Sequence, residues 1–447
     1  MTTWEQRERA SDKAVPITER KYVGPLMLIT SLFFLWALGV NLNDVLIPHL
    51  KKAFGLTDFR SSLVQTAFFG GYFIAALPAG WVMERVGYKK GLLVGLITCA
   101  TGAALFYPAA SSLLYGFFLF ALFIMACGQS FLEVGANPYV TVLGPAESSE
   151  RRLNIAQSFN AVGAVLTPIL GAAFILTKTE YTSSQFSAMT AAQLQAYRVA
   201  EANTVKIPYL VIASVFLLVA LLIYLTDLPE IRERREPKEL PGVSTGLRGA
   251  LAHRHLILGI VALFFYCGAQ VGVGSFVIRF VQYLNPGTPA TIAANYLKLH
   301  LFGFMIGRFT GSGIMKYVPA PRLLWFFAAG AVVCMIVALL GFGVLPMWAV
   351  VLTGFFNSIM FPTIFALSLK SLGPFTKRAS SLLVMAIIGS ATFPALMGFI
   401  SDRSSIRTSF VIPLVCYLVV FCYGMWWYKP VALGGLNQAI AVEAPAK

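Results

Sequence analysis

The chain has 447 residues, of which 57% are hydrophobic and only 12% are charged. A soluble domain carries about a quarter charged residues, so this composition excludes an ordinary soluble protein. The net charge is +15, but the basic residues fall in short connections between apolar runs, where they orient a membrane protein and do not indicate nucleic-acid binding. The six cysteines show no CxxC spacing, and we expect no disulfide, metal or cofactor.

Twelve apolar segments follow one another along the chain, each long enough to cross a hydrocarbon core of about 30 Å. They lack the alternation over about ten residues that is typical of barrel strands. The predicted fold class is therefore an all-α polytopic membrane protein with twelve transmembrane helices in two six-helix pseudo-repeats. The expected spans are residues 24–49, 61–84, 90–108, 112–143, 153–176, 207–226, 256–283, 290–315, 321–343, 346–371, 379–400 and 409–428.

The distribution of basic residues predicts that both termini are cytoplasmic, because most of the 34 Lys and Arg residues then lie on the cytoplasmic side. Thr190 and Gln193 predict a capping box that opens a short external helix ending at Asn203. The expected regions are a cytoplasmic tail over 1–23, a six-helix bundle over 24–226, a charged cytoplasmic linker over 227–255, a second six-helix bundle over 256–428 and a cytoplasmic tail over 429–447.

The two halves repeat each other in sequence. The segment from Pro138 to Gly171, with its step Gly144-Pro145, is echoed by the segment from Pro362 to Gly398, with its step Gly373-Pro374. Two six-helix halves in parallel repeat are typical of a transporter whose halves rock around a site at the middle of the membrane.

Two acidic residues lie inside predicted spans. Asp44 follows Asn41 by one helical turn and is next to Asn43, and Glu133 shares a helix face with Asn137. A carboxylate at the centre of a span costs roughly 2.5–3.5 kcal/mol, and such groups mark proton relays and ion pathways. We predict that Asp44 and Glu133 couple transport to protons; the alternative is that each makes only structural hydrogen bonds between helices.

Amides and aromatic rings complete the candidate site. One half supplies acids and the other neutral donors and ring faces, a combination that suits an uncharged ligand with many hydroxyl groups. Individually the amides could also join helices, and the aromatic rings could serve packing alone. The predicted substrate-binding residues are Asn41, Asn43, Glu133, Asn137, Gln157, Asn160, Gln270, Asn295, Asn357 and Phe361.

Charged residues at the cytoplasmic ends of the spans are candidates for gating. We expect the pairs Glu84-Arg85 and Arg151-Arg152 to latch the cytoplasmic side in one state and to release it in the other. Arg308 lies near a span end and has either a gating or a structural role.

Several motifs carry a resemblance to a known family. The loop from Gly80 to Lys90 resembles the signature of the major facilitator superfamily between its second and third spans. Asn41-Leu42-Asn43-Asp44, Phe131-Leu132-Glu133, Ala136-Asn137-Pro138-Tyr139 and the segment from Arg152 to Asn160 resemble the fucose permease family of sugar–proton symporters, which includes fucose and glucose/galactose transporters.

The resemblance implies a role for each matching residue. Asp44 would be the protonation site, Glu133 would couple protonation to sugar binding, and Gln157 and Asn160 would bind sugar hydroxyls. Phe361 and Gly274 stand where the fucose member has Tyr and Trp, which favours another hexose over fucose.

We therefore expect a transporter and not an enzyme: a proton-coupled symporter of a neutral hexose, monomeric, in the bacterial inner membrane. A sodium-coupled sugar symporter and a sugar-binding membrane sensor that does not transport are the alternatives. Sodium dependence of uptake would select the first, and sugar binding without entry into sealed vesicles the second.

Overall fold

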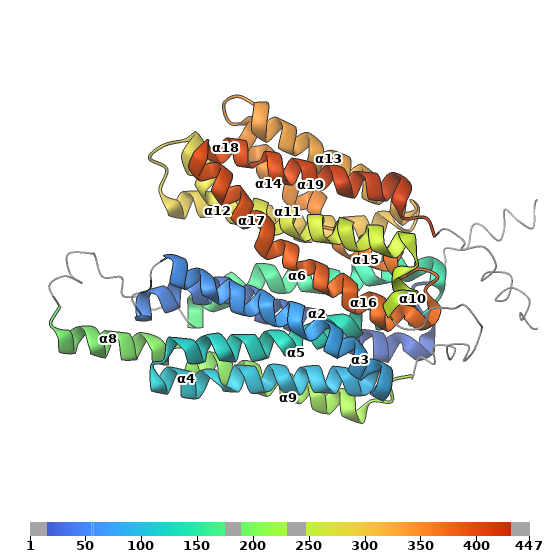
Figure 1. Ribbon diagram of the computed structural model, residues 1–447, viewed down its shortest axis with the longest axis horizontal. Helices are drawn as coiled ribbons and strands as arrows, with labels where there is room; N and C mark the ends of the chain where they lie inside the picture. Colours follow the sequence, from blue (N-terminus) through green and yellow to red (C-terminus); the bar gives the residue numbers. More distant parts are fainter. Residues whose placement is uncertain (1–15, 55, 57, 175–188, 230–246, 431–447) are drawn as a thin grey trace, which may run out of the picture.

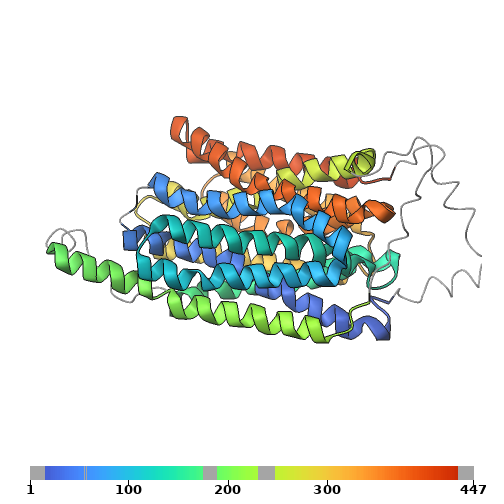
Figure 2. The same ribbon diagram turned by 60° about the horizontal axis from the view of Figure 1, so that its bottom comes forward.

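The protein is described here by a computed structural model that covers residues 16–54, 56, 58–174, 189–229 and 247–430. These residues form helices and connecting turns, with no strand among them. Figure 1 shows two groups of roughly parallel helices, with the helices before α10 below and most of those after it above. The second view keeps the helices aligned along the same long axis (Figure 2).

The N-terminal group holds the first six spans, and one long helix contains two of them. In this helix, α3, the spans meet at Gly87, whose φ of 84° needs a residue without a Cβ atom. The elements are η1 (Arg20–Tyr22), α2 (Val23–Phe54), α3 (Asp58–Ala104), α4 (Phe106–Ser112), α5 (Tyr115–Val142), η2 (Ala146–Ser148), α6 (Ser149–Phe174), α8 (Ala191–Asn203) and α9 (Lys206–Leu225).

The C-terminal group holds the other six spans, and its last three spans are each built from more than one helical piece. The elements are α10 (Leu247–Leu251), α11 (Arg254–Leu284), α12 (Ala290–Ile314), α13 (Ala320–Leu340), α14 (Leu345–Asn357), α15 (Met360–Leu369), η3 (Gly373–Phe375), α16 (Thr376–Met385), η4 (Ala386–Ile388), α17 (Gly389–Arg403), α18 (Ile406–Ser409), α19 (Val411–Cys422) and the π-helix η5 (Tyr423–Trp427).

Among the described residues, nine helical stretches are long and apolar enough to cross a membrane. One of them is the double span of α3. Helices α6 and α12 are not among the nine, although each has the length of a span. They pack against each other across the two groups, so their more polar sequences face protein instead of lipid.

The predicted repeat is visible in the backbone. Gly144 and Gly373 both have positive φ, and each is followed directly by a proline and then, after a 3₁₀ turn, by the start of the next span; Gly373 is itself the first residue of its 3₁₀ turn. The predicted capping box is also confirmed, since the Thr190 hydroxyl and the Gln193 side chain cap the first turn of α8 reciprocally. The fourth span differs from its expected bounds: it begins at Tyr115, after a left-handed Leu113, and it continues through Pro138 to Val142.

The two groups touch mainly through α16 of the C-terminal group and α6 of the N-terminal group. Helix α16 packs against α3 and α5, and α6 packs against α12 and α15. A direct hydrogen bond joins the Ser380 hydroxyl of α16 to the Val134 carbonyl of α5 (2.8 Å). Helices α8 and α10 lie at opposite ends of the bundle, and both ends of the described chain lie at the α10 end (Figure 1).

Candidate functional site

A chain of buried polar side chains begins in the N-terminal half. Glu133 on α5 is 5% exposed, and Asn137 lies one turn further along the same helix. The Asn137 side-chain oxygen accepts a hydrogen bond from the Gln157 amide of α6 (3.0 Å). The predicted faces of the fourth and fifth spans therefore do meet.

Tyr72 on α3 joins this cluster and was not predicted from the sequence. Its hydroxyl donates to Gln129 on α5 (3.3 Å), and within α5 the Asn137 amide donates to the Glu133 backbone carbonyl (3.1 Å). The signal in the sequence was a tyrosine in the middle of the second span. The amide nitrogen of Gln129 is buried without a hydrogen-bond partner, so the cluster keeps an unused donor.

Arg308 on α12 connects this cluster to the other half. It is 3% exposed, and its guanidinium donates to the Gln157 side-chain oxygen (3.0 Å) and also to the Gln157 backbone oxygen. A third bond reaches the Ser358 carbonyl (2.9 Å). Arg308 was expected near a span end, but it lies in the buried contact between α6 and α12.

The tenth span is interrupted where Arg308 reaches it. Helix α14 ends at Asn357 and α15 begins at Met360. Two carbonyls at the break accept hydrogen bonds from other helices, Asn357 from the Tyr266 hydroxyl (2.9 Å) and Ser358 from Arg308. A helix break at membrane depth is tolerated only where other protein groups form hydrogen bonds with its free backbone groups. Because Arg308 supplies one of these bonds, the break is part of the candidate site.

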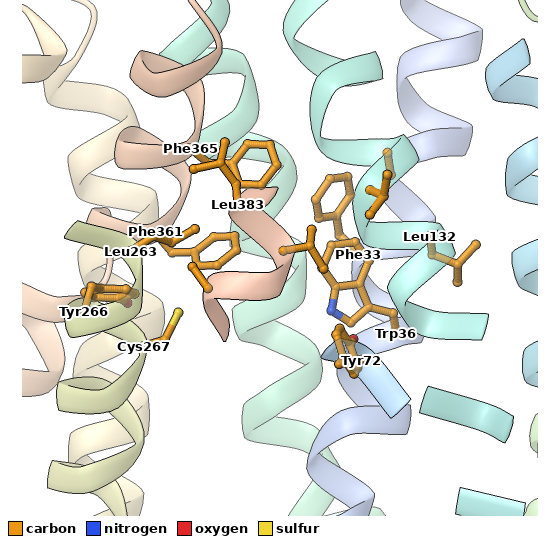
Figure 3. Close-up of a cluster of buried hydrophobic side chains, with 14 of the residues drawn as sticks. Phe33, Trp36, Tyr72, Leu132, Leu263, Tyr266, Cys267, Phe361, Phe365 and Leu383 are labelled. Carbon is orange, nitrogen blue, oxygen red and sulfur yellow. The ribbon is translucent and has the colours of Figure 1, made fainter. Parts of the chain in front are cut away.

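Aromatic rings flank the polar chain on both sides. Figure 3 shows Phe33, Trp36 and Tyr72 in the N-terminal half, with Phe361 and Tyr266 in the C-terminal half. Phe33 and Trp36 lie 4.7 Å apart between ring centroids. Phe361 stacks on Phe365 at 5.9 Å, which fixes its ring beside the break of the tenth span. Ring faces next to amides are suited to the C–H and O–H groups of a sugar.

The helix that carries Asp44 lies directly against α6. The Asn160 amide of α6 donates to the Phe33 carbonyl of α2 (3.2 Å), and a Cβ atom on Gly163 would lie 2.9 Å from the Phe34 carbonyl. Asn41 is half-buried and donates to the Ala37 carbonyl of its own helix (2.7 Å). The side chains of Asp44 and Asn43 lie outside the described residues.

The other predicted binding residues are more scattered. Gln270 on α11 is half-buried. Asn295 is exposed on α12 and accepts from Lys298 (3.3 Å), away from the buried chain. Asn357 is fully buried, and neither of its side-chain polar atoms has a hydrogen-bond partner. It lies behind the break and supplies its backbone carbonyl to Tyr266.

Ion pairs between the halves close the α10 end of the bundle. Glu84 forms a two-pronged pair with Arg378, at 2.6 Å and 3.1 Å. Glu150 pairs with Lys370 at 3.0 Å. Of these, only Glu84 was predicted as a gating residue. Its partner Arg378 lies in the opposite half, whereas the sequence had suggested a pair with the neighbouring Arg85.

Arg308, also a gating candidate, bridges the halves as described above, whereas the other three arginines make no described contact across them. Arg85 lies over the Trp81 ring at 3.7 Å, and Arg151 is half-buried with its Nε unpaired. Arg152 is fully buried within the N-terminal half, where it donates to the carbonyls of Val140 (2.6 Å), Thr141 and Ile17 (2.7 Å). Arg152 thus joins the segment before α2 to the turn between α5 and α6.

Twelve spans in two repeats, with a buried polar chain between the halves, are the architecture of a membrane transporter that works by alternating access. The chain belongs to the Major Facilitator Superfamily, whose family model matches residues 29–387. This makes it a multi-pass membrane transporter and not an enzyme, as expected.

The relatives agree with the narrower resemblance. The chain is 42% identical over 422 residues to an L-fucose-proton symporter of Escherichia coli (strain K12), covering 94% of this chain and 96% of that protein. It is 40% identical over 412 residues to a glucose/galactose transporter of Brucella abortus biovar 1 (strain 9-941), covering 91% and 95%. A crystal structure of the transporter FucP in the outward conformation matches with a TM-score of 0.84 at 40% identity, covering 92% of this chain and all of that one.

Proposed function

We propose that this protein is a secondary active transporter that moves a neutral hexose together with a proton across the bacterial inner membrane. The observation that carries the proposal is the buried chain Asn137–Gln157–Arg308, which places amide and guanidinium groups between two halves that must rock. One relative is named an L-fucose-proton symporter and another a glucose/galactose transporter. These names support the proton as the coupling ion and a hexose as the substrate.

In this mechanism Asp44 takes up the proton and Glu133 links protonation to sugar binding. Gln157 and Asn160 bind sugar hydroxyls, and Phe361 offers a ring face. Loading neutralises buried charge, which lowers the barrier to rocking because a bare carboxylate is costly away from water. The pairs Glu84–Arg378 and Glu150–Lys370 hold the α10 end closed until the site is loaded.

We further propose that the protein acts as a monomer and that the α10 end faces the cytoplasm, with both termini on that side. The basic residues of the connections support this orientation. Four predicted amide residues outside the buried chain, Asn41, Gln270, Asn295 and Asn357, would contribute to binding only in a rearranged state. Asn43 is also proposed to bind the sugar.

The experiment is uptake and counterflow of labelled fucose, galactose, glucose and N-acetylglucosamine in proteoliposomes with an imposed pH gradient and no sodium. We expect one sugar to accumulate and the accumulation to collapse with a protonophore. If uptake requires sodium at constant pH, the coupling ion is sodium and not the proton. Binding without uptake into sealed vesicles would indicate a sensor and refute the proposed transport.

A further inference from the structure

Three aromatic rings of the C-terminal half meet beside the break in the tenth span. Figure 3 shows Tyr266 of α11 together with Phe361 and Phe365 of α15. Phe361 lies 6.4 Å from Tyr266 and 5.9 Å from Phe365, measured between ring centroids. Tyr266 and Phe365 are fully buried, whereas Phe361 keeps 8% of its surface exposed. Phe361 is therefore the ring of this group that can contact a ligand, and the other two rings support it.

The position of Phe361 depends on the break, because this residue lies in the first turn of α15. In a continuous helix the Asn357 carbonyl would accept a hydrogen bond from the Phe361 N–H, four residues later. Here α14 ends at Asn357 and α15 begins at Met360. The Asn357 carbonyl accepts a hydrogen bond from the Tyr266 hydroxyl (2.9 Å). A hydroxyl of α11 thus holds the end of α14 just before the turn that carries the Phe361 ring.

The two carbonyls at the break differ in what they can do without their present donors. Ser358 is followed four residues later by Pro362, which has no N–H, so its carbonyl needs a donor from another helix in any case. Asn357 is followed four residues later by Phe361, which has an N–H. Without the Tyr266 hydroxyl the Asn357 carbonyl would be a buried acceptor short of a donor, which is unfavourable. Binding to the Phe361 N–H would satisfy it, close the turn and displace the Phe361 ring.

We infer that Tyr266 is a positioning residue for the sugar: its hydroxyl holds the break and its ring supports Phe361, so that Phe361 presents its face to the bound hexose. The inference rests on the proposed function, in which Phe361 offers a ring face to the sugar. Tyr266 acts without touching the sugar, since it is fully buried. Its loss should therefore weaken sugar binding and leave the coupling to protons, which Asp44 and Glu133 carry in the other half, in place.

The test is counterflow in proteoliposomes of the full chain, measured over a range of concentrations of the labelled hexose that the wild-type protein transports. Tyr266→Phe keeps the ring and removes only the hydroxyl. We expect it to raise the half-saturating sugar concentration about fivefold, because one buried hydrogen bond is lost, and to leave the maximal rate per folded protein nearly unchanged.

Two further variants separate positioning from general stability. Tyr423→Phe is the matched control, because Tyr423 is also fully buried and its hydroxyl bonds to the Ser368 hydroxyl (2.9 Å), at the end of α15 away from Phe361. It should leave the half-saturating concentration unchanged. Phe361→Leu removes the ring face and should itself raise that concentration. If Tyr266 acts through Phe361, adding Tyr266→Phe to Phe361→Leu should raise it no further.

An unchanged half-saturating concentration in Tyr266→Phe would overturn the inference and leave the proposed function intact. The same rise in the wild-type and Phe361→Leu backgrounds would also overturn it, because Tyr266 would then act independently of the ring. Absence of counterflow of every tested hexose by the wild-type protein would refute the proposed function, and the inference with it. If Tyr266→Phe does not fold, as judged by thermal unfolding, Tyr266→Met fills the space without a hydroxyl and replaces it with the same expected rise.

Discussion

At the scale of single residues, Arg308 is the group that ties the two halves together at the polar chain. Three hydrogen bonds leave its guanidinium, two to Gln157 and one to Ser358. A lysine keeps the charge but lacks the planar fork that makes several bonds at once. Losing bonds of a buried charged group costs about 1.5–3 kcal/mol each.

We therefore expect Arg308→Lys to lower sugar counterflow by tenfold or more, measured in proteoliposomes at matched protein density. Arg279→Lys is the control, since Arg279 is exposed on α11 and lies only over the Phe276 ring, at 5.0 Å. Undiminished counterflow in Arg308→Lys would remove Arg308 from the proposed mechanism.

Asp44 is the proposed proton acceptor, and an amide at this position cannot take up a proton. We expect Asp44→Asn to lose accumulation of sugar driven by a pH gradient but to keep exchange of labelled for unlabelled sugar. Both are measured in the same vesicles, so that exchange reports on folding and binding. Accumulation with normal proton uptake in Asp44→Asn would show that another residue carries the proton.

At the scale of helices, the contact between α2 and α6 depends on a residue without a side chain. A Cβ atom at Gly163 would lie 2.7 Å from the Ala37 Cβ and 2.9 Å from the Phe34 carbonyl, and the carbonyl cannot move away without shifting α2. Overpacking of this kind costs about 1–3 kcal/mol. Gly163→Ala should lower the temperature of thermal unfolding in detergent. Gly274→Ala, where a Cβ atom meets nothing within 4 Å, should leave it unchanged, and equal melting of the two variants would contradict this account.

The ion pair between α3 and α16 is the second contact that acts between helices. Glu84→Gln removes one partner of the pair with Arg378, which is worth at most about 1 kcal/mol because both side chains are partly exposed. We expect a several-fold faster reaction of a cysteine at Ser381 with a maleimide applied from the α10 side. Glu147→Gln, at an exposed glutamate of the same half, should not change the rate.

The exchanged pair Glu84→Arg with Arg378→Glu should restore slow labelling. Labelling that stays fast in the exchanged pair would mean that the charges act separately and not as a latch.

The sequence predicted the number of spans, their order and the repeat, because apolar length and the Gly-Pro steps are local signals. The break in the tenth span was not predicted, although Pro362 lies four residues after Ser358 and cannot donate the hydrogen bond that the Ser358 carbonyl would accept in a continuous helix. Tyr266 and Arg308, which are distant in the sequence, satisfy the carbonyls there. The helix faces that carry Asn137 and Gln157 could be predicted, because Asn137 lies four residues after Glu133 and Gln157 three residues before Asn160. The partner of Glu84 was not predicted, because a charge at the end of a span gives no information on which helix of the other half it meets.

At the scale of the whole molecule, the α10 end is closed and the halves must separate there during transport. Asn154 of α6 and Thr363 of α15 are both buried, and their side chains are joined by a 3.1 Å hydrogen bond across the halves. Two cysteines at these positions bridged by a short bifunctional thiol reagent should stop counterflow. Sugar binding from the α8 end, measured by calorimetry, should persist. Continued counterflow of the bridged protein would show that the halves do not separate at this contact.

The buried Arg152 has a consequence for how the protein can be handled. The Ile17 carbonyl, ahead of the first span, accepts one of the hydrogen bonds of the Arg152 guanidinium. Beside it the Ser148 hydroxyl donates to the Pro16 carbonyl, and the Thr18 hydroxyl donates to the Leu143 carbonyl. A chain trimmed back to the start of α2 would leave a buried guanidinium short of an acceptor, at a cost of about 1–3 kcal/mol. An affinity tag or a fluorescent fusion is therefore best placed at the C-terminus or well ahead of Pro16, and a protease site should not be engineered between Pro16 and Val23.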